Sequence, residues 1–204
     1  MDATSAVTLL ALGAFHGINP GMGWLFAVAL GLQERRREAV WRALLPLALG
    51  HSLAVAAAVL VALTLGLVMS AEHLRWPVAV VLVALGTSRL ARHRHPRWAA
   101  MRVRMGKLTL WSFLMASAHG AGLMVVPVFA GMTASRPACH GSATLGDALV
   151  ATGVHGLGYV LVTAVIAILV FERLGVGILR KAWVNLDTVW AVALIATGIL
   201  TAVA

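Results

Sequence analysis

Apolar residues run along the chain in six long stretches, and a polar or charged cluster separates each stretch from the next. An α-helix needs about 20 consecutive apolar residues to cross the hydrocarbon core of a bilayer. The six predicted spans are Ala6–Leu30, Leu44–Met69, Leu74–Leu90, Leu108–Met132, Ala148–Phe171 and Leu186–Val203. The pattern therefore predicts an all-α integral membrane protein with six transmembrane helices.

Composition and charge support this prediction. Hydrophobic residues make up 61% of the 204 residues and charged residues 11%, which is unlike the usage of a soluble protein. Nearly all of the 16 lysines and arginines follow the first, third and fifth spans, and the opposite side has only Arg75 and Arg136. By the positive-inside rule, both termini lie on the outer, periplasmic side of a bacterial cytoplasmic membrane.

The same features exclude several classes of protein. A formal net charge of +9 would suit nucleic acid, but the basic residues lie in short blocks between apolar runs, where they set membrane orientation. The single cysteine, Cys139, rules out an internal disulfide and a paired-thiol redox relay. The sequence has no nucleophile–base arrangement and no phosphate-binding loop. We therefore expect a protein that is not an enzyme, whose surroundings are the lipid bilayer, and whose oligomeric state is open.

Three spans in each half mean that a second copy of the first half must insert upside down. Weak internal similarity supports such a repeat, at nearly equal offsets: His16 with His119, His51 with His155, and Leu82–Gly86 with Leu194–Gly198. We therefore predict two inverted three-helix repeats, residues 1–92 and 108–204, joined by a basic cytoplasmic loop, residues 93–107, in one membrane domain. Inverted repeats are a transporter architecture, with the substrate bound where the halves meet.

Four histidines lie inside the predicted spans. An ionisable side chain within a membrane is costly, so it marks a functional-site hypothesis. Counting along the predicted helices places His16 and His119 near the middle of the bilayer. The same count places His51 and His155 about seven residues into their helices, but from opposite faces. The duplicated set predicts one shared site.

Glycine and proline follow or flank two of these histidines. Proline removes a helical hydrogen bond and crowds the preceding turn, and glycine loosens it. Non-helical backbone at membrane depth is tolerated where it is buried or lines a cavity, and unwound carbonyls are good ion ligands. The residues expected to form the two helix breaks and the transport path are Gly17, Pro20 and Gly21 in the first half and Gly120 and Gly122 in the second.

Two short stretches resemble a known family. The stretch Gly13–Gly21, which contains His16 and Pro20, resembles the first-helix signature of the NicO-type nickel/cobalt transporters, His-Gly-x-x-Pro-Gly-His. Leu49–Ser52 resembles that family's second-helix histidine motif, and the inverted three-helix repeat is similar to the LysE superfamily of exporters. The resemblance implies that His16 and His51 bind metal.

This sequence departs from the family signature at two positions. Asn19 stands where the family has an acidic residue, and Met22 stands where it has its second histidine. Imidazole is a common ligand for nickel, cobalt, copper and zinc, whereas methionine sulfur favours Cu(I). The candidate metal ligands are His16, His51, His119, His155, Met22 and Asn19.

The predicted function is a secondary transporter that exports a transition-metal cation, either nickel- or cobalt-like or a soft ion such as Cu(I). The metal is the substrate, and no permanently bound cofactor is expected. No Asp or Glu lies at the centre of a span, so a bare divalent cation would lack a countercharge. This favours a monovalent ion, a ligand-bound metal, or metal binding coupled to loss of protons from histidine.

Two other functions stay open at this point. One is export of a small organic solute such as an amino acid, which explains the missing carboxylates better and the four histidines worse. The other is a membrane subunit that binds haem b, with the four histidines as axial ligands. The sequence leaves open whether the outer-loop pair Cys139-His140 or Asp187, at the start of the sixth span, takes part in either function.

Overall fold

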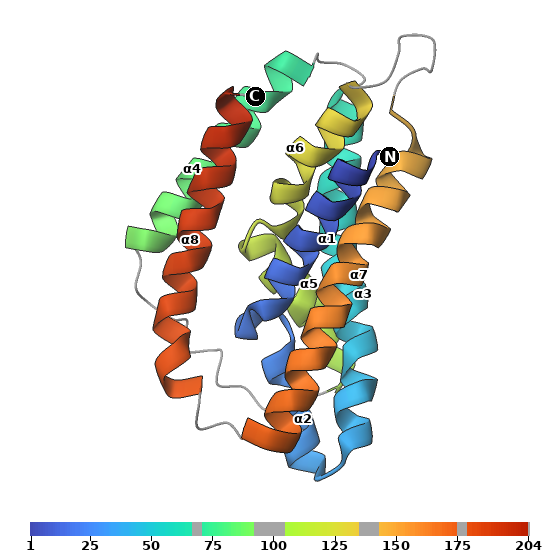
Figure 1. Cartoon of the computed structure of the whole chain (residues 1–204), viewed down its shortest axis with the longest axis vertical. Coiled ribbons are helices and arrows are strands. Elements are labelled where there is room, and N and C mark those ends of the chain that lie inside the picture. The colour runs from blue at the N-terminus through green and yellow to red at the C-terminus, as the bar shows by residue number, and fades with distance from the viewer. Residues whose placement is uncertain (67–70, 92–104, 135–142, 175–178, 204) are drawn as a thin grey trace.

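The computed structural model describes residues 1–66, 71–91, 105–134, 143–174 and 179–203, and within these ranges the chain is a helical bundle without β-strands (Figure 1). The elements are α1 (Ala3–Ile18), η1 (Pro20–Met22), α2 (Trp24–Glu34), α3 (Arg37–Gly66), α4 (Ala71–Ala91), η3 (Met105–Lys107), α5 (Leu108–Ala118), α6 (Ala121–Ala134), α7 (Leu145–Leu169), η5 (Val170–Leu174) and α8 (Leu179–Val203). The all-α prediction is confirmed for this part of the chain.

Two helices are long and apolar enough to cross a membrane: α3, and α7 continued to Arg173. The pair Met105–Ala118 and Ala121–Met132, bent by 64°, makes a third if it is taken as one span. Three shorter apolar helices, Ala3–Ile18, Trp24–Glu34 and Thr188–Val203, occupy the first and sixth predicted spans. A membrane-spanning helical protein is therefore indicated, and two or three of the predicted spans meet the length and composition requirement.

Apolar side chains point outward along α3 and α7. Leu45 is 67% exposed and Leu161 is 54% exposed, and other leucines on the same two helices are similarly open. A contiguous exposed apolar surface of this kind is unfavourable in water and suits contact with lipid or another protein. By contrast, His16, His51 and His155 are completely buried. The bundle thus has polar groups inside and an apolar exterior, as expected of helices in a bilayer.

Local sequence signals explain where the helices begin and end. Asp2 caps α1 by accepting a hydrogen bond from the Ser5 backbone N–H at 3.2 Å. Hydrogen bonds from the side chain and backbone of Ser5 keep the pKa of Asp2 below its ordinary value. Thr144 and Asp147 form a reciprocal capping box at the start of α7. Between α2 and α3, Arg35 adopts a left-handed conformation with φ of 52°, which ends α2.

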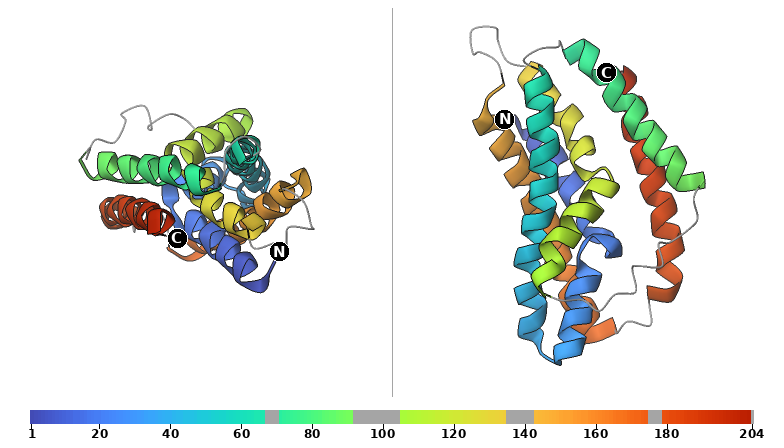
Figure 2. Two further views of the ribbon diagram at one scale, coloured as in Figure 1. Left: turned by 90° about the horizontal axis from the view of Figure 1, so that it is seen from above. Right: turned by 180° about the vertical axis from the view of Figure 1, so that it is seen from behind.

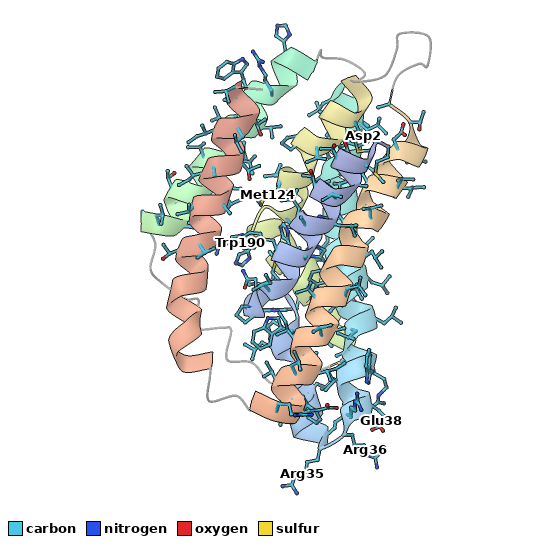
Figure 3. The ribbon with its side chains drawn as sticks, viewed as in Figure 1. Asp2, Arg35, Arg36, Glu38, Met124 and Trp190 are labelled. Atoms are coloured by element: carbon cyan, nitrogen blue, oxygen red, sulfur yellow. The ribbon has the colours of Figure 1, made fainter. Side chains whose placement is uncertain are left out.

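The helices pack as a main bundle with a pair of helices beside it (Figures 1 and 2). Helix α1 packs against α7, α3 against α5, and α4 against α8. Both ends of the chain lie at one end of the molecule, and Arg35 and Arg36 lie at the opposite end (Figure 3). The α4–α8 pair stands beside the main bundle and meets it chiefly through α6.

The two helices of the α4–α8 pair approach each other closely and reciprocally. A Cβ atom added at Gly86 would lie 2.8 Å from the Ala191 carbonyl oxygen of α8. A Cβ atom added at Gly198 would lie 2.9 Å from the Ala79 carbonyl oxygen of α4. Glycine at both positions is therefore needed for this backbone contact, as at small-residue interfaces of membrane helices.

Candidate functional site

The first break separates α1 from α2. Asn19 leaves the helix with φ of −69° and ψ of 119°, and its Oδ1 accepts a hydrogen bond from Gly21 N–H at 2.9 Å. Pro20 then opens the short 3₁₀ helix η1, and Gly23 precedes α2. Proline is favoured at the first position of a helical turn because it has no N–H to satisfy there. The helix therefore breaks where the sequence predicts, from Asn19 to Gly23.

The second break is shorter and sharper. Helix α5 ends at Ala118, His119 and Gly120 form a turn, and α6 begins at Ala121 with a bend of 64°. Gly120 has φ of +70°, which strongly favours glycine. Trp190 Nε1 donates to the His119 carbonyl oxygen at 3.0 Å, and Arg89 donates to the Ala118 carbonyl oxygen at 2.7 Å. Backbone groups released by the break thus bond to side chains.

Two of the expected break residues lie elsewhere. Gly17 is inside α1, and a Cβ atom there would lie 2.8 Å from the Tyr159 carbonyl oxygen of α7. Gly122 is inside α6, and a Cβ atom there would lie 3.0 Å from the Ala54 carbonyl oxygen of α3. Both glycines allow close helix packing and do not unwind the backbone. The structure thus places them in the helices that flank the breaks, because a single glycine is compatible with a helix that is packed on a neighbour, and their part in the transport path stays a prediction.

The histidines at the two breaks make the same local hydrogen bond. His16 Nδ1 donates to the Leu12 carbonyl oxygen at 2.6 Å, and His119 Nδ1 donates to the Met115 carbonyl oxygen at 2.8 Å. A neutral imidazole that donates through Nδ1 carries its free lone pair on Nε2. In His16 that Nε2 atom is buried and has no hydrogen-bond partner. A lone pair in this position is what a metal ion or a hydrogen-bond donor requires.

Three histidines meet in the core. The ring centroid of His16 lies 5.6 Å from that of His51 and 5.0 Å from that of His155. The rings of His51 and His155 are nearly parallel, and their Nε2 atoms are 3.2 Å apart. These three residues are called the histidine cluster below. It combines one histidine each from α1, α3 and α7.

The contact between His51 and His155 corrects the depth expected from the sequence. The predicted spans placed these two residues about seven residues into their helices from opposite faces, on either side of the bilayer midplane, whereas their side chains touch. The reason is the length of α3, which begins at Arg37 instead of Leu44. His51 therefore lies midway along its helix. The backbone of α7 comes close enough to α1 for His155 to meet His16 because Gly13 faces the His155 carbonyl group.

Trp190 connects the cluster to the fourth histidine. Its ring stacks on Phe15 with centroids 4.5 Å apart. Its centroid is also 4.7 Å from that of His16, in an edge-to-face arrangement. The ring of His119 lies 6.0 Å from that of Trp190. Trp190 reaches from α8 toward α1 in Figure 3. The structure therefore gathers His16, His51 and His155 directly, and His119 shares with His16 a contact to Trp190.

Asn19 and Met22, the remaining candidate ligands, are buried at the first break. The Oδ1 of Asn19 is engaged by Gly21, and its Nδ2 has no partner. The side chain of Met22 packs in the apolar core, and its carbonyl oxygen accepts a hydrogen bond from Tyr159 at 2.7 Å. A Cβ atom at Gly21 would lie 3.5 Å from the end of the Met115 side chain, so this break faces α5.

Sequence reasoning missed three residues that shape the site. Tyr159 stacks flat on His51, with centroids 3.8 Å apart and an angle of 4°. It is the single tyrosine of the chain and follows His155 by one helical turn, a spacing that shares one helix face. The other two are Trp190 and Arg89, which donate to the carbonyl oxygens of His119 and Ala118. Neither contact has a local sequence signal, because both partners are distant in the chain.

As the side chains stand, no group of three or more His, Cys, Asp or Glu residues in the described ranges could hold a metal ion. The Nε2 atoms of His51 and His155 face each other, so metal binding requires these rings to turn. Cys139, His140 and most of the predicted basic loop lie outside the described residues, as does the side chain of Asp187.

The fold and its interior define a class: a helical bundle with a lipid-compatible exterior and a buried histidine cluster beside a broken helix. Comparison of the chain with family models, with curated proteins and with solved structures gives no match. The resemblance to NicO-type transporters therefore stays a prediction from two short stretches of sequence.

Proposed function

We propose that this chain is a secondary membrane transporter that exports a transition-metal cation, either nickel- or cobalt-like or a soft ion such as Cu(I). The observation that carries the proposal is the histidine cluster beside the first break, with the Nε2 lone pair of His16 buried and unpartnered. Neutral imidazole is a common ligand for these metals. Broken helices at membrane depth are where transporters bind ions and substrates.

The arrangement of helices supports the six-span, inverted-repeat architecture that we propose with this function. If α1 and the α5–α6 pair are equivalent, and α3 is equivalent to α7, the α1–α7 contact corresponds to the α5–α3 contact, and both are extensive. The α4–α8 pair would then lie on the symmetry axis. Its reciprocal glycine contacts, Gly86 on Ala191 and Gly198 on Ala79, are what a two-fold relation requires.

The positions of charge support the proposed orientation. Arg35 and Arg36 lie at the end of the molecule opposite both chain ends (Figure 3). Arg37 and Glu172 form an ion pair of 2.9 Å there, and Arg42 and Glu34 form another of 2.7 Å. Because basic residues favour the cytoplasmic side, this end would face the cytoplasm and the termini would face the periplasm.

In the proposed mechanism, the metal binds His16 through Nε2 and replaces the contact between His51 and His155. The resolved carboxylate side chains, Asp2, Glu34, Glu38, Asp147 and Glu172, lie near helix ends. The ligand set near the cluster is therefore uncharged. Alternating access would come from movement of one three-helix half against the other.

The test is metal flux into liposomes that contain the purified protein, measured separately for Ni²⁺, Co²⁺ and Cu⁺. We expect one of these to cross at least ten times faster than in protein-free liposomes, and His16→Ala and His51→Ala to abolish the difference. His73→Ala, an exposed histidine at the start of α4, is the matched control and should be active. Flux of none of the three metals, given alone or with citrate or L-histidine, or full flux in both cluster variants, would contradict the proposal.

The haem alternative is less well supported by the positions of His51 and His155. Axial histidines bind haem iron from opposite faces of the macrocycle. Nε2 atoms 3.2 Å apart on nearly parallel rings leave no space for a macrocycle between His51 and His155. Export of a small zwitterionic solute is a second candidate, because the buried Nδ2 of Asn19 can donate a hydrogen bond to a carboxylate.

A further inference from the structure

Several buried polar atoms at the first break lack hydrogen-bond partners, and their chemistry differs. His16 Nδ1 donates to Leu12, so its unpartnered Nε2 is an acceptor. Asn19 Oδ1 accepts from Gly21, so its unpartnered Nδ2 is a donor with two N–H groups. Asn19 is 5% exposed and His16 is 0% exposed, so neither atom is satisfied by bulk water. The first break therefore has both an unpaired hydrogen-bond acceptor and an unpaired hydrogen-bond donor.

The pair His51 and His155 adds one more of each kind. Two neutral imidazoles whose Nε2 atoms are 3.2 Å apart share one N–H, so one ring donates and the other accepts. The donating ring then has its lone pair on Nδ1, and the accepting ring has its N–H there. Both Nδ1 atoms are buried and without a partner. The unpaired atoms thus include both donors and acceptors.

A bare metal ion cannot satisfy such a site. A cation accepts lone pairs only, so it could bind His16 and the available Nδ1 but would leave the Asn19 amide N–H groups unpaired. An unsatisfied buried donor is unfavourable, and an Asn nitrogen is not a metal ligand. A metal ion that carries its own carboxylate ligand resolves both problems, because a carboxylate oxygen accepts from Asn19 while the metal faces imidazole. The carboxylate also supplies the negative charge that the cluster lacks.

Asn19 follows His16 closely in the chain, and its backbone N–H donates to the His16 carbonyl oxygen at 3.2 Å. It is one helical turn from His16 and caps the same helix end. Its side chain adjoins Gly21, whose Cβ position lies 3.4 Å from Asn19 Oδ1 and 3.5 Å from Met115 of α5. The first break, with the Asn19 side chain, therefore lies near Met115 of α5.

We propose that the transported species is a metal ion bound to a small carboxylate ligand, recognised by His16 through the metal and by Asn19 through the carboxylate. The proposal rests on the proposed transport function and specifies its substrate. It assigns Asn19 a role in selecting the chelate over the free ion, and it replaces the expectation that Asn19 itself binds the metal.

The experiment uses proteoliposomes and the metal that moves in the assay above, given alone, with radiolabelled citrate, or with radiolabelled L-histidine. We expect at least one of these ligands to raise metal uptake about tenfold and to accumulate together with the metal. Metal uptake that is equal or faster without either ligand, or metal that enters while both labels stay outside, overturns the inference and leaves the transport function standing. Absence of metal uptake in every form contradicts the transport function itself.

Two variants of Asn19 separate recognition from folding. Asn19→Asp keeps the acceptor for Gly21 but replaces the donor with a negative charge, so uptake of the chelate should fall about tenfold and uptake of the free ion should rise. Asn19→Ser keeps a helix-capping oxygen and removes the N–H groups, so it should lower chelate uptake without helping the free ion. Unchanged preference in both variants would overturn the role of Asn19.

Discussion

At both breaks, backbone carbonyl oxygens accept hydrogen bonds from side chains, but these side chains come from different regions of the molecule. At the first break, Trp24 donates to the Ile18 carbonyl oxygen and Tyr159 to that of Met22, so the fastening residues come from α2 and α7. At the second break, the carbonyl oxygens of Ala118 and His119 accept from Arg89 of α4 and Trp190 of α8. Each break thus has two backbone carbonyls held by two long side chains.

This difference separates a chemical role from a mechanical one. The first break is hydrogen-bonded to side chains of the main bundle. It contains the unpaired amide of Asn19 and follows His16 of the histidine cluster. The second break is hydrogen-bonded to side chains of the α4–α8 pair, which stands beside the bundle. A displacement of that pair would therefore move the second break before the first. In the inverted-repeat proposal, the two halves share a scaffold and have diverged in what their breaks do.

The largest expected effect concerns the two break histidines. The sequence repeat makes His16 and His119 equivalent, whereas the structure has His16 in contact with both His51 and His155. We expect His16→Ala to lower metal transport at least about 100-fold and His119→Ala about tenfold, through loss of support for Trp190. Flux in proteoliposomes, normalised to the amount of folded protein, measures both. Equal losses would show that the breaks act alike.

The next effect is on stability and compares glycines at the two breaks. Gly120 has φ of +70°, a conformation that costs a residue with a side chain about 1–2 kcal/mol. Gly21 has no positive φ, and a Cβ atom there would meet its nearest neighbours at 3.4 and 3.5 Å, an ordinary contact. Gly120→Ala should therefore lower thermal stability in detergent clearly, and Gly21→Ala little. The reverse order would mean that the first break is the more constrained backbone.

The helices and the first break could be predicted from the sequence, whereas the grouping of the histidines could not. Long apolar stretches predict the helices and Pro20 predicts the first break, because both signals lie in adjacent residues of the chain. The grouping of His51 with His155 depends on the length and crossing of α3 and α7, and span prediction placed the pair at different depths for that reason. The role of Trp190 depends on a contact over 71 positions, which a single sequence does not reveal.

A smaller effect tests the hydrogen bond from Tyr159 to the first break. Tyr159→Phe keeps the ring that stacks on His51 and removes the hydroxyl that donates to the Met22 carbonyl oxygen. Loss of this hydrogen bond should cost about 1 kcal/mol. Amide hydrogen exchange measured by mass spectrometry should become faster from Asn19 to Trp24 and stay the same from Ala118 to Leu123. Faster exchange at both breaks would show that they open together.

The smallest effect comes from the fastening of the second break to α4. Arg89 places a positive charge on the carbonyl end of α5, where a cation stabilises a helix by about 0.3–1 kcal/mol. Arg89→Gln should lose this stabilisation, and Arg89→Lys should retain most of it because one N–H donor suffices for the Ala118 carbonyl. Hydrogen exchange should therefore increase from Ala118 to Leu123 in the glutamine variant alone, while the first break is unaffected.

Because α4 contacts the bundle at few points, even this small loss should free the α4–α8 pair, and transport should change in rate more than in metal preference. A change in preference of the same size would instead place Arg89 among the residues that meet the substrate.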